Sequence, residues 1–204
     1  MQQFWHESVT EESWHLLQRL AREQTFVLIG GWAAYLHTRA QKSKDIDIVV
    51  DFEALRQLDS EFGLAKNDRL LKYEIKHGEV DVDIYVPKFS RLSYPVEKIL
   101  ENHDVVDGIR VATVPQLLLL KLGAYQDRKG SAKGEKDAID IVSILYSSKF
   151  DKGAFEKAAA DTEVGKPLKL LYDVVSEFPE SSLQFVGADY VAFKKWRREF
   201  LKSR

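Results

Sequence analysis

Apolar positions divide the first half of the chain into short segments that alternate between a strand period and a helix period. Strands carry apolar runs or strict alternation, whereas helices repeat apolar residues every three to four positions. Glycine at His77-Gly78 separates two of the strand segments, so we expect a hairpin there. The pattern predicts strands at residues 25–29, 45–50, 70–75, 79–86 and 108–112, and helices at residues 11–23, 30–36, 52–61 and 95–101.

From residue 113 onward the apolar spacing is helical throughout. Thr113, Pro115 and Gln116 provide an N-cap, a proline in the first turn and a capping-box partner, so we expect a helix to begin there. The polar segment 129–134 is predicted to be a mobile linker that becomes ordered when substrate binds. The predicted helices of this half span residues 114–128, 135–146, 153–160, 167–177 and 189–203.

These elements predict an α/β (α+β) fold, in which a small mixed β-sheet flanked by helices is followed by a helical C-terminal half. With 204 residues and 45% hydrophobic content, the chain can bury a sizeable core. We expect residues 1–112 to form the core with its N-terminal helix. Residues 113–204 are expected to form a helical region that completes the active-site cleft.

Composition and charge narrow the function classes. Lys and Arg number 30 and Asp and Glu number 32, so the formal net charge of -2 neither attracts nor repels nucleic acid globally. The chain has no cysteine, which excludes disulfides and thiolate zinc sites, and its histidines lack ligand spacing. We find no signal-like segment and no long apolar run, and therefore expect a cytoplasmic protein without membrane contact.

The candidate chemistry centres on Asp45 and Asp47, at the start of the second predicted strand. Strand side chains alternate, so both carboxylates face the same side of the sheet. Adjacent carboxylates repel each other unless water solvates both or a hard cation such as Mg²⁺ or Mn²⁺ lies between them. Upstream, Gly30 and Gly31 lie at a strand-to-helix turn, where backbone amides and the helix dipole can hold phosphate. Together these features predict a site for a nucleoside triphosphate (NTP) and a metal ion.

A third carboxylate is expected from the strand at residues 79–86, which carries Asp81 and Asp83. Because they are two residues apart, their side chains share one face of the strand. Either one can complete the metal site or accept a proton from the attacking group. The sequence pattern alone leaves both open.

The series Ile29-Gly30-Gly31 followed by Asp45-Ile46-Asp47 resembles the core pattern of the nucleotidyltransferase superfamily. This resemblance implies metal-dependent transfer of a nucleoside monophosphate from an NTP to an acceptor hydroxyl, with release of pyrophosphate. It favours Asp83 as the third carboxylate, because the strand continues directly after it. Many members have a serine at the position of Gly31, so only the backbone contact to phosphate is retained here.

A longer series looks like the abortive-infection toxin branch of that superfamily, the AbiEii and MenT-like group. Lys121 and Arg128 are seven residues apart and share one helix face, from which two cations can neutralise a triphosphate. The resemblance implies that role for Lys121, and a supporting or substrate-orienting role for Asp140 or Asp137. It also places Ser43 and Lys44 among the nucleotide-binding residues. The matching residues are Gly30-Gly31-Trp32-Ala33-Ala34-Tyr35-Leu36, Arg39, Ser43-Lys44-Asp45-Ile46-Asp47, Lys121-Leu122, Ala124, Arg128 and Lys136-Asp137-Ala138-Ile139-Asp140-Ile141.

The acceptor stays open at this point. The resemblance allows the 3′ end of a tRNA, a protein hydroxyl, or a small molecule such as an aminoglycoside or lincosamide. It also implies a cognate antitoxin protein as a partner. The alternative in a different class is a non-catalytic nucleotide-binding or regulatory module that keeps the fold without turnover.

Structural explanations compete with each functional one. Asp45 and Asp47 can lie on a solvated edge strand or cap the N-terminus of a helix. The cations Lys121 and Arg128 can form surface ion pairs of small energy with Asp137 and Asp140. Trp32 and Tyr35 can stack on a base, although core packing is the more common role. The basic aromatic segment 193–200 can bind an RNA backbone, but we favour an amphipathic helix with its aromatic residues packed inward.

Overall fold

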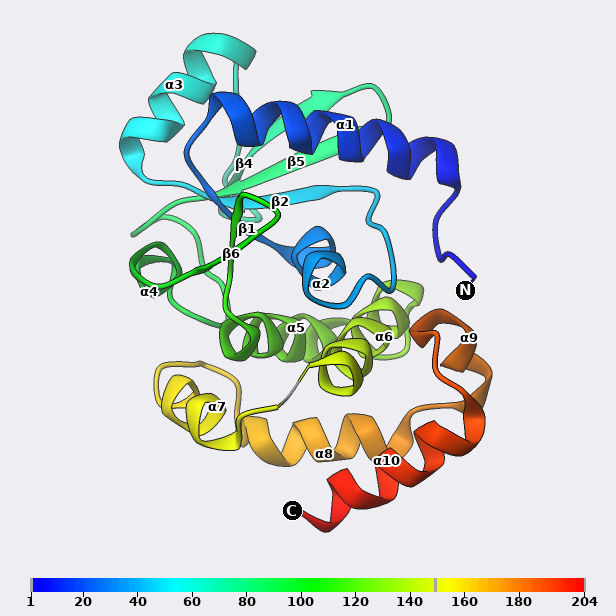
Figure 1. The fold of residues 1–204 in the computed structure, drawn as a ribbon. Helices are drawn as coiled ribbons and strands as arrows, with labels where there is room; N and C mark the ends of the chain where they lie inside the picture. The colour runs from blue at the N-terminus through cyan, green and yellow to red at the C-terminus, as the bar shows by residue number, and fades with distance from the viewer. Residues whose placement is uncertain (1, 149, 204) are drawn as a thin grey trace.

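The computed structural model describes residues 2–148 and 150–203, in which a seven-stranded mixed sheet lies between two groups of helices (Figure 1). The strand order is β3-β4-β5-β2-β1-β7-β6. The strands are β1 (Val27–Ile29), β2 (Ile46–Val49), β3 (Ala65–Asn67), β4 (Lys72–His77), β5 (Val80–Tyr85), β6 (Asp104–Val106) and β7 (Ile109–Val111). The helices are α1 (Glu7–Glu23), α2 (Gly30–Thr38), α3 (Phe52–Phe62), α4 (Val96–Glu101), α5 (Val114–Arg128), α6 (Ala132–Ser147), α7 (Lys152–Ala159), α8 (Pro167–Glu177), the 3₁₀ turn η1 (Glu180–Ser182), α9 (Leu183–Val186) and α10 (Tyr190–Lys202).

The centre of the sheet is the strand trio β5, β2 and β1. Strand β2 runs parallel to β5 and antiparallel to β1, and β4 and β5 form the predicted hairpin. On β5 the residues Val80, Val82 and Ile84 are fully buried, whereas the alternate residues between them are only partly buried. This alternation puts the acidic side chains of β5 on one face of the sheet.

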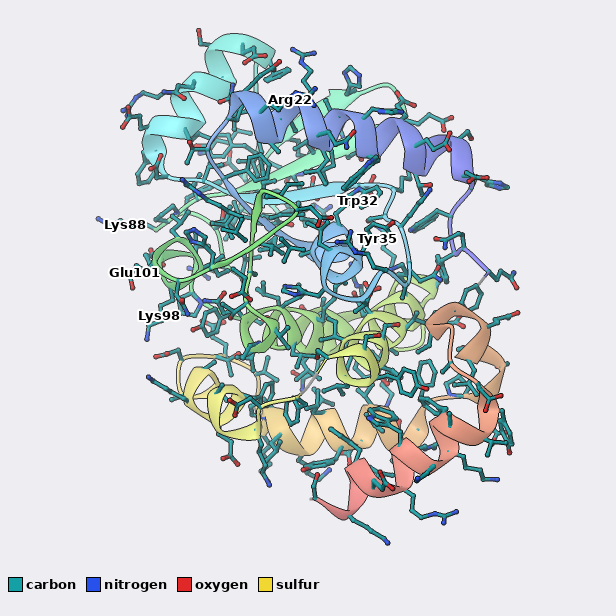
Figure 2. The ribbon with its side chains drawn as sticks, in the orientation of Figure 1. Arg22, Trp32, Tyr35, Lys88, Lys98 and Glu101 are labelled. Atoms are coloured by element: carbon teal, nitrogen blue, oxygen red, sulfur yellow. The ribbon has the colours of Figure 1, made fainter. Side chains whose placement is uncertain are left out.

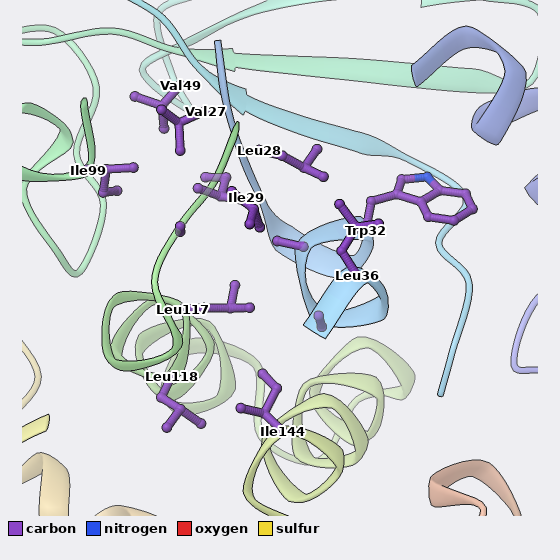
Figure 3. Close-up of a cluster of buried hydrophobic side chains, with 14 of the residues drawn as sticks. Val27, Leu28, Ile29, Trp32, Leu36, Val49, Ile99, Leu117, Leu118 and Ile144 are labelled. Carbon is purple, nitrogen blue, oxygen red and sulfur yellow. The ribbon is translucent and has the colours of Figure 1, made fainter. Parts of the chain in front are cut away.

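Helices α5 and α6 pack against α2, and through it against the sheet (Figure 1). In the core, Ile29 and Leu36 from the β1-α2 unit lie near Leu117 of α5 and Ile144 of α6 (Figure 3). All are buried, so the helical half and the sheet half share one hydrophobic core. The predicted mixed α/β fold with a helical second half is therefore confirmed.

The aromatic residues of α2 belong to this core rather than to a binding surface. Trp32 is 1% exposed, and its indole nitrogen donates a hydrogen bond to the Ser13 hydroxyl at 2.8 Å. Tyr35 packs edge-to-face on the Trp32 ring, and both are labelled in Figure 2. The structural explanation of these two residues is confirmed.

Helix α10 is the amphipathic helix that the sequence analysis favoured for the basic aromatic segment. Phe193 is buried, and the rings of Trp196 and Phe200 stack on each other with a centroid distance of 5.4 Å. The aromatic face packs against α6 and α8 through Tyr146 and Tyr172. The aromatic side chains of the basic segment therefore point inward, as predicted.

Some boundaries differ from the sequence prediction. Helix α1 begins at Glu7 rather than at residue 11, and the short elements β3, β6 and α9 were missed. The predicted linker at residues 129–134 is shorter than expected, because α6 begins at Ala132 and Ser131 caps it. The Ser131 hydroxyl accepts a hydrogen bond from the amide of Gly134 at 3.1 Å and donates one to the carbonyl of Arg128 at 2.7 Å. The ordering of the linker when substrate binds stays a prediction. Across the described ranges 2–148 and 150–203, no helix combines the length and the apolar content needed to span a membrane.

Candidate active site

A cleft of about 310 Å³ opens between strands β1, β2 and β5 on one side and helices α5 and α6 on the other. It brings together most of the residues that the sequence predicted to form the site. From the sheet side it is lined by Gly30, Gly31, Ser43, Asp45, Asp47 and Asp83. From the helical side it is lined by Lys121, Arg128, Lys136, Asp137 and Asp140.

Both glycines at the start of α2 are required by the side chains packed over them. A Cβ atom at Gly30 would lie 2.1 Å from the Oδ2 atom of Asp47, and Gly30 also has a φ of 70°. A Cβ atom at Gly31 would lie 2.4 Å from the Oγ atom of Ser43. The glycine turn therefore packs directly against Asp47 and Ser43, at the positive end of the α2 dipole.

Strand register brings two of the predicted carboxylates together. Asp47 lies opposite Ile29 on β1 and opposite Asp83 on β5. Asp45 lies just before β2 and also faces the cleft, and its Oδ1 atom is buried without a hydrogen-bond partner among the described residues. Asp45, Asp47 and Asp83 thus line one wall, immediately beside the glycine turn.

Asp83 is held in place by a lysine that the sequence analysis did not single out. The Nζ atom of Lys72 on β4 lies 2.6 Å from Asp83 Oδ2 and 3.0 Å from Glu74 Oε1. The Lys72 side chain is only 12% exposed, so this is a largely enclosed ion pair. The Oδ1 atom of Asp83 is buried without a hydrogen-bond partner in the described chain. One oxygen of this carboxylate is therefore fixed and the other is available.

Two predicted residues do not line the cleft. Asp81 lies on the same strand face as Asp83, but it pairs with Lys76 at 3.0 Å near the surface. Of the two candidates for the third carboxylate, the structure therefore places Asp83 in the cleft. Lys44 is also absent from the cleft lining, whereas its neighbour Ser43 lies over Gly31.

Two carboxylates of the sheet wall, those of Asp47 and Asp83, have raised pKa values. Burial, together with the charges of Asp83 and Asp45, raises the pKa of Asp47 to about 6, while Lys121 and Lys72 oppose the shift. Burial also raises the pKa of Asp83, although Lys72 works against it. Negative charge is therefore costly on this wall in the isolated protein, as expected of carboxylates that await a cation.

The helical wall is a buried network of ion pairs. Lys121 on α5 lies 3.3 Å from Asp137 Oδ1 and 2.7 Å from Asp140 Oδ2, and Lys136 lies 2.5 Å from Asp140 Oδ1. Arg128 binds both oxygens of Asp137, at 2.6 Å and 3.0 Å. The side chains of Asp137 and Asp140 are 1% and 2% exposed. These ion pairs are buried, and the alternative explanation of Lys121 and Arg128 as partners in exposed surface ion pairs is therefore wrong.

Ionisation in this wall follows from burial and pairing. Burial works to lower the pKa of Lys121, but the charges of Asp140 and Asp137 outweigh it and the pKa is raised. For Asp140, burial works to raise the pKa, but Lys121 and Lys136 outweigh it and the pKa is lowered. Burial lowers the pKa of Lys136, although the charge of Asp140 opposes the shift. The raised pKa values keep Lys121 and Arg128 charged, and the charges of both interact with that of Asp47 on the opposite wall.

Sequence reasoning missed several residues in and beside the cleft. Tyr85 lines the cleft, and the alternation that singled out Asp83 also puts Tyr85 on the same face of β5. Lys72 reaches Asp83 from the neighbouring strand of the hairpin. Arg91, in a loop, and Lys133, in the first turn of α6, also line the cleft. Neither position belongs to a repeating apolar pattern in the sequence. A further lining residue, Trp5, comes from the segment before α1, and no short-range pattern predicts this contact.

The sheet wall carries carboxylates of the kind that bind a divalent cation. In residues 2–148 and 150–203, no group of three or more His, Cys, Asp or Glu side chains has the geometry of a complete metal site. Mg²⁺, however, is usually held by one or two carboxylates together with water and substrate phosphates. Asp45 and Asp47, with the unpartnered Oδ1 atom of Asp45, fit that kind of shared site.

No protein-family model and no curated protein matches the chain. Among solved structures, an antigenic nucleotidyltransferase-like protein from Paracoccidioides brasiliensis is 16% identical, with 91% of this chain and 96% of that one covered and a TM-score of 0.49. A candidate nucleotidyltransferase from H. pylori is 17% identical, with 98% of both chains covered and a TM-score of 0.52. At this identity the second likeness carries information on the fold alone: this chain shares its mixed α/β fold with that protein.

Proposed function

We propose that this protein is a metal-dependent nucleotidyltransferase that moves a nucleoside monophosphate from an NTP to an acceptor hydroxyl. The observation that carries the proposal is the meeting of Asp45, Asp47 and Asp83 beside the Gly30-Gly31 turn in one cleft. A triphosphate needs a backbone cradle, a cation held by carboxylates and an opposing positive wall. The cleft supplies residues for each of these requirements.

The triphosphate is proposed to bind between the glycine turn and the helical wall. Backbone amides at the start of α2 and the hydroxyl of Ser43 are suited to donate to phosphate oxygens. Lys121 and Arg128 stay charged, because their pairing with Asp137 and Asp140 raises their pKa values. Their positive charges would neutralise the phosphates, and the buried carboxylates would hold the cationic side chains in position.

Asp45 and Asp47 are the proposed ligands of a Mg²⁺ or Mn²⁺ ion, with Asp83 as a third ligand or as a base. When bound, such an ion neutralises phosphate charge and increases the reactivity of the attacking oxygen. Asp83 is suited to accept a proton because Lys72 fixes its Oδ2 atom and leaves Oδ1 without a partner among the described residues. Burial raises the pKa of Asp83, which makes it a stronger proton acceptor.

In the proposed reaction, the acceptor oxygen forms a bond to the α-phosphorus of the NTP, and its proton passes to Asp83. The bond from the α-phosphorus to the bridging oxygen of the β-phosphate breaks, and pyrophosphate leaves with the electron pair. Lys121 and Arg128 would stabilise the negative charge that develops on the leaving pyrophosphate. The products are a nucleotidylated acceptor and pyrophosphate.

Pyrophosphate release from each NTP, measured with Mg²⁺ and a panel of acceptors, tests the proposal. Asp47→Asn should reduce release by at least about a hundredfold, because loss of even an outer-shell partner of a metal site typically costs 10- to 100-fold. Asp81→Asn is the matched control, since Asp81 lies on the same face of β5 as Asp83 but outside the cleft. Release that is unaffected by Asp47→Asn would refute the proposal.

The acceptor panel should contain total tRNA, a protein extract, and aminoglycoside and lincosamide antibiotics. Labelling of tRNA or protein, relieved by the product of a neighbouring gene, would favour the abortive-infection toxin branch and its cognate antitoxin. Labelling of a drug would favour an antibiotic-modifying enzyme. Tight NTP binding without release for any acceptor would favour the non-catalytic nucleotide-binding module.

A further inference from the structure

Trp5 lies in the cleft although it precedes the first helix. Its side chain shares the cleft lining with Gly31 and Ser43 and is only partly buried. Its ring meets the Phe4 ring edge-to-face, with a centroid distance of 5.2 Å and an interplanar angle of 78°. It forms no hydrogen bond or ion pair with the described residues. Part of the Trp5 ring therefore faces the cleft and remains accessible to a ligand.

The segment that carries Trp5 is fastened by Gln41, which is 1% exposed. The Gln41 Oε1 atom accepts a hydrogen bond from the Phe4 amide at 2.8 Å. Its Nε2 atom donates to the carbonyl of Gln2 at 2.8 Å and to that of Phe185 at 2.7 Å. A buried amide left unpaired costs free energy, so these three hydrogen bonds favour one arrangement of the segment.

Further contacts connect the same segment to the loop before Asp45 and to α9. Gln3 donates to the carbonyl of Ala40 at 3.3 Å and accepts from the amide of Lys42 at 3.1 Å. Phe4 packs on Phe185, so the N-terminal segment lies beside α9, as Figure 1 shows. Trp5 is therefore held next to the loop that carries Ser43 and Asp45, on the glycine side of the cleft.

An aromatic ring at the edge of a phosphate-binding cleft matches the chemistry of a nucleobase. All nucleobases can stack on aromatic side chains, whatever the identity of the base. The rigid indole loses little conformational entropy on stacking. We infer that Trp5 stacks on the base of the NTP whose triphosphate lies on the Gly30-Gly31 turn. This inference rests on the proposed function, since it assigns the base to the NTP bound there. Tyr85, another aromatic side chain of the lining, lies on β5 beside the carboxylates.

Calorimetric titration of the whole chain with each NTP, and with inorganic tripolyphosphate, separates base from phosphate binding. All titrations contain Mg²⁺. Trp5→Leu keeps an apolar side chain but removes the aromatic ring, and it should weaken NTP binding by about tenfold or more. Binding of tripolyphosphate should stay within about twofold, because the phosphate contacts lie elsewhere. Trp5→Phe is the conservative variant and should restore NTP binding to within about threefold of wild type.

Intrinsic fluorescence gives a second readout. The other tryptophans, Trp14, Trp32 and Trp196, lie outside the cleft lining. We expect NTP to quench the emission of wild type, and this quenching should vanish in Trp5→Phe although that variant still binds NTP. Tripolyphosphate should cause little quenching.

The outcomes separate the two proposals. If Trp5→Leu binds NTP as tightly as wild type, or loses tripolyphosphate affinity to the same extent, the stacking inference is refuted while the proposed function stands. If Trp5→Leu changes only the KM for the acceptor, the inference is also refuted, because the base belongs to the acceptor. If wild type and Trp5→Phe bind NTP more tightly than Trp5→Leu but no acceptor yields pyrophosphate, the inference stands and the proposed function fails.

Discussion

The carboxylate of Asp47 occupies the space that a side chain at Gly30 would need. A Cβ atom at Gly30 would lie 2.1 Å from Asp47 Oδ2, far inside van der Waals contact. Asp47 is in turn paired in register with Asp83 on the neighbouring strand. The glycine turn, Asp47 of β2 and Asp83 of β5 therefore form one packed unit, and a substitution at one of them should affect the packing of the others.

Gly30→Ala should destabilise the protein more than Gly63→Ala does. Gly30 has a φ of 70° and Gly63 a φ of 67°, so alanine is strained at both positions, but only Gly30 has a side chain over it. We expect the overlap with Asp47 to add about 2 kcal/mol to the loss of unfolding free energy. Urea denaturation of the two variants measures the difference. Equal losses would show that Asp47 does not pack over the turn.

Asp47→Asn should stabilise the isolated protein at neutral pH. The pKa of Asp47 is about 6 in the folded chain against an ordinary value of 3.8, so the folded state binds the proton more tightly. The unfolding free energy of wild type therefore falls as pH rises from about 4 to 6, and the penalty is fully present above pH 6. The variant lacks this penalty and should be more stable by up to about 3 kcal/mol at pH 7, but not at pH 4. Thermal unfolding across this pH range tests the sign, and Asp81→Asn should leave the profile unchanged.

Mg²⁺ should remove much of that pH dependence. A cation held by Asp45 and Asp47 favours the charged form of Asp47, so it stabilises wild type most above pH 6, where Asp47 is ionised. Melting temperatures with and without Mg²⁺ at pH 7 should differ for wild type and not for Asp45→Asn or Asp47→Asn. An equal shift in all three proteins would mean that the ion acts elsewhere.

Asp137→Asn should be strongly destabilising. Asp137 is 1% exposed and accepts from both Lys121 and Arg128, so its loss leaves cations in a buried wall with one carboxylate fewer. Removing one partner of a buried ion pair typically costs about 3 kcal/mol or more. Glu177→Gln is the control, because Glu177 pairs with Lys129 on the surface and should leave the unfolding transition in place. A small effect of Asp137→Asn would indicate that water already screens this wall.

Much of the fold was predictable because its signals are local. The capping box of Thr113 and Gln116 begins α5 at the predicted residue, and period-two alternation identified β5. The missed strands β3 and β6 are three residues long and largely exposed, so they have no apolar pattern, and only pairing with β4 and β7 defines them. The linker was predicted too long because the polar residues that follow Ser131 form the first turn of α6, which Ser131 caps, and they carry no apolar period.

The candidate site was predictable as far as its residues follow a strand or helix period. Asp47 and Asp83 share a sheet face through register, and alternation allows this to be foreseen. Neither the ion pair between Lys72 and Asp83 nor the position of Trp5 in the cleft follows from the spacing of residues in the sequence. Each depends on contacts between segments distant in the sequence, such as that of Gln41 with Phe185.

Transfer of label from an NTP tests the central claim most directly. Wild type is incubated with Mg²⁺ and the acceptor panel, using NTP labelled on either the α- or the γ-phosphate, beside Asp47→Asn and Asp81→Asn. The account predicts that α-label moves to the acceptor while γ-label is released as pyrophosphate, and that Asp47→Asn abolishes both but Asp81→Asn neither. Transfer of γ-label to the acceptor, or α-label transfer that survives Asp47→Asn, would contradict it.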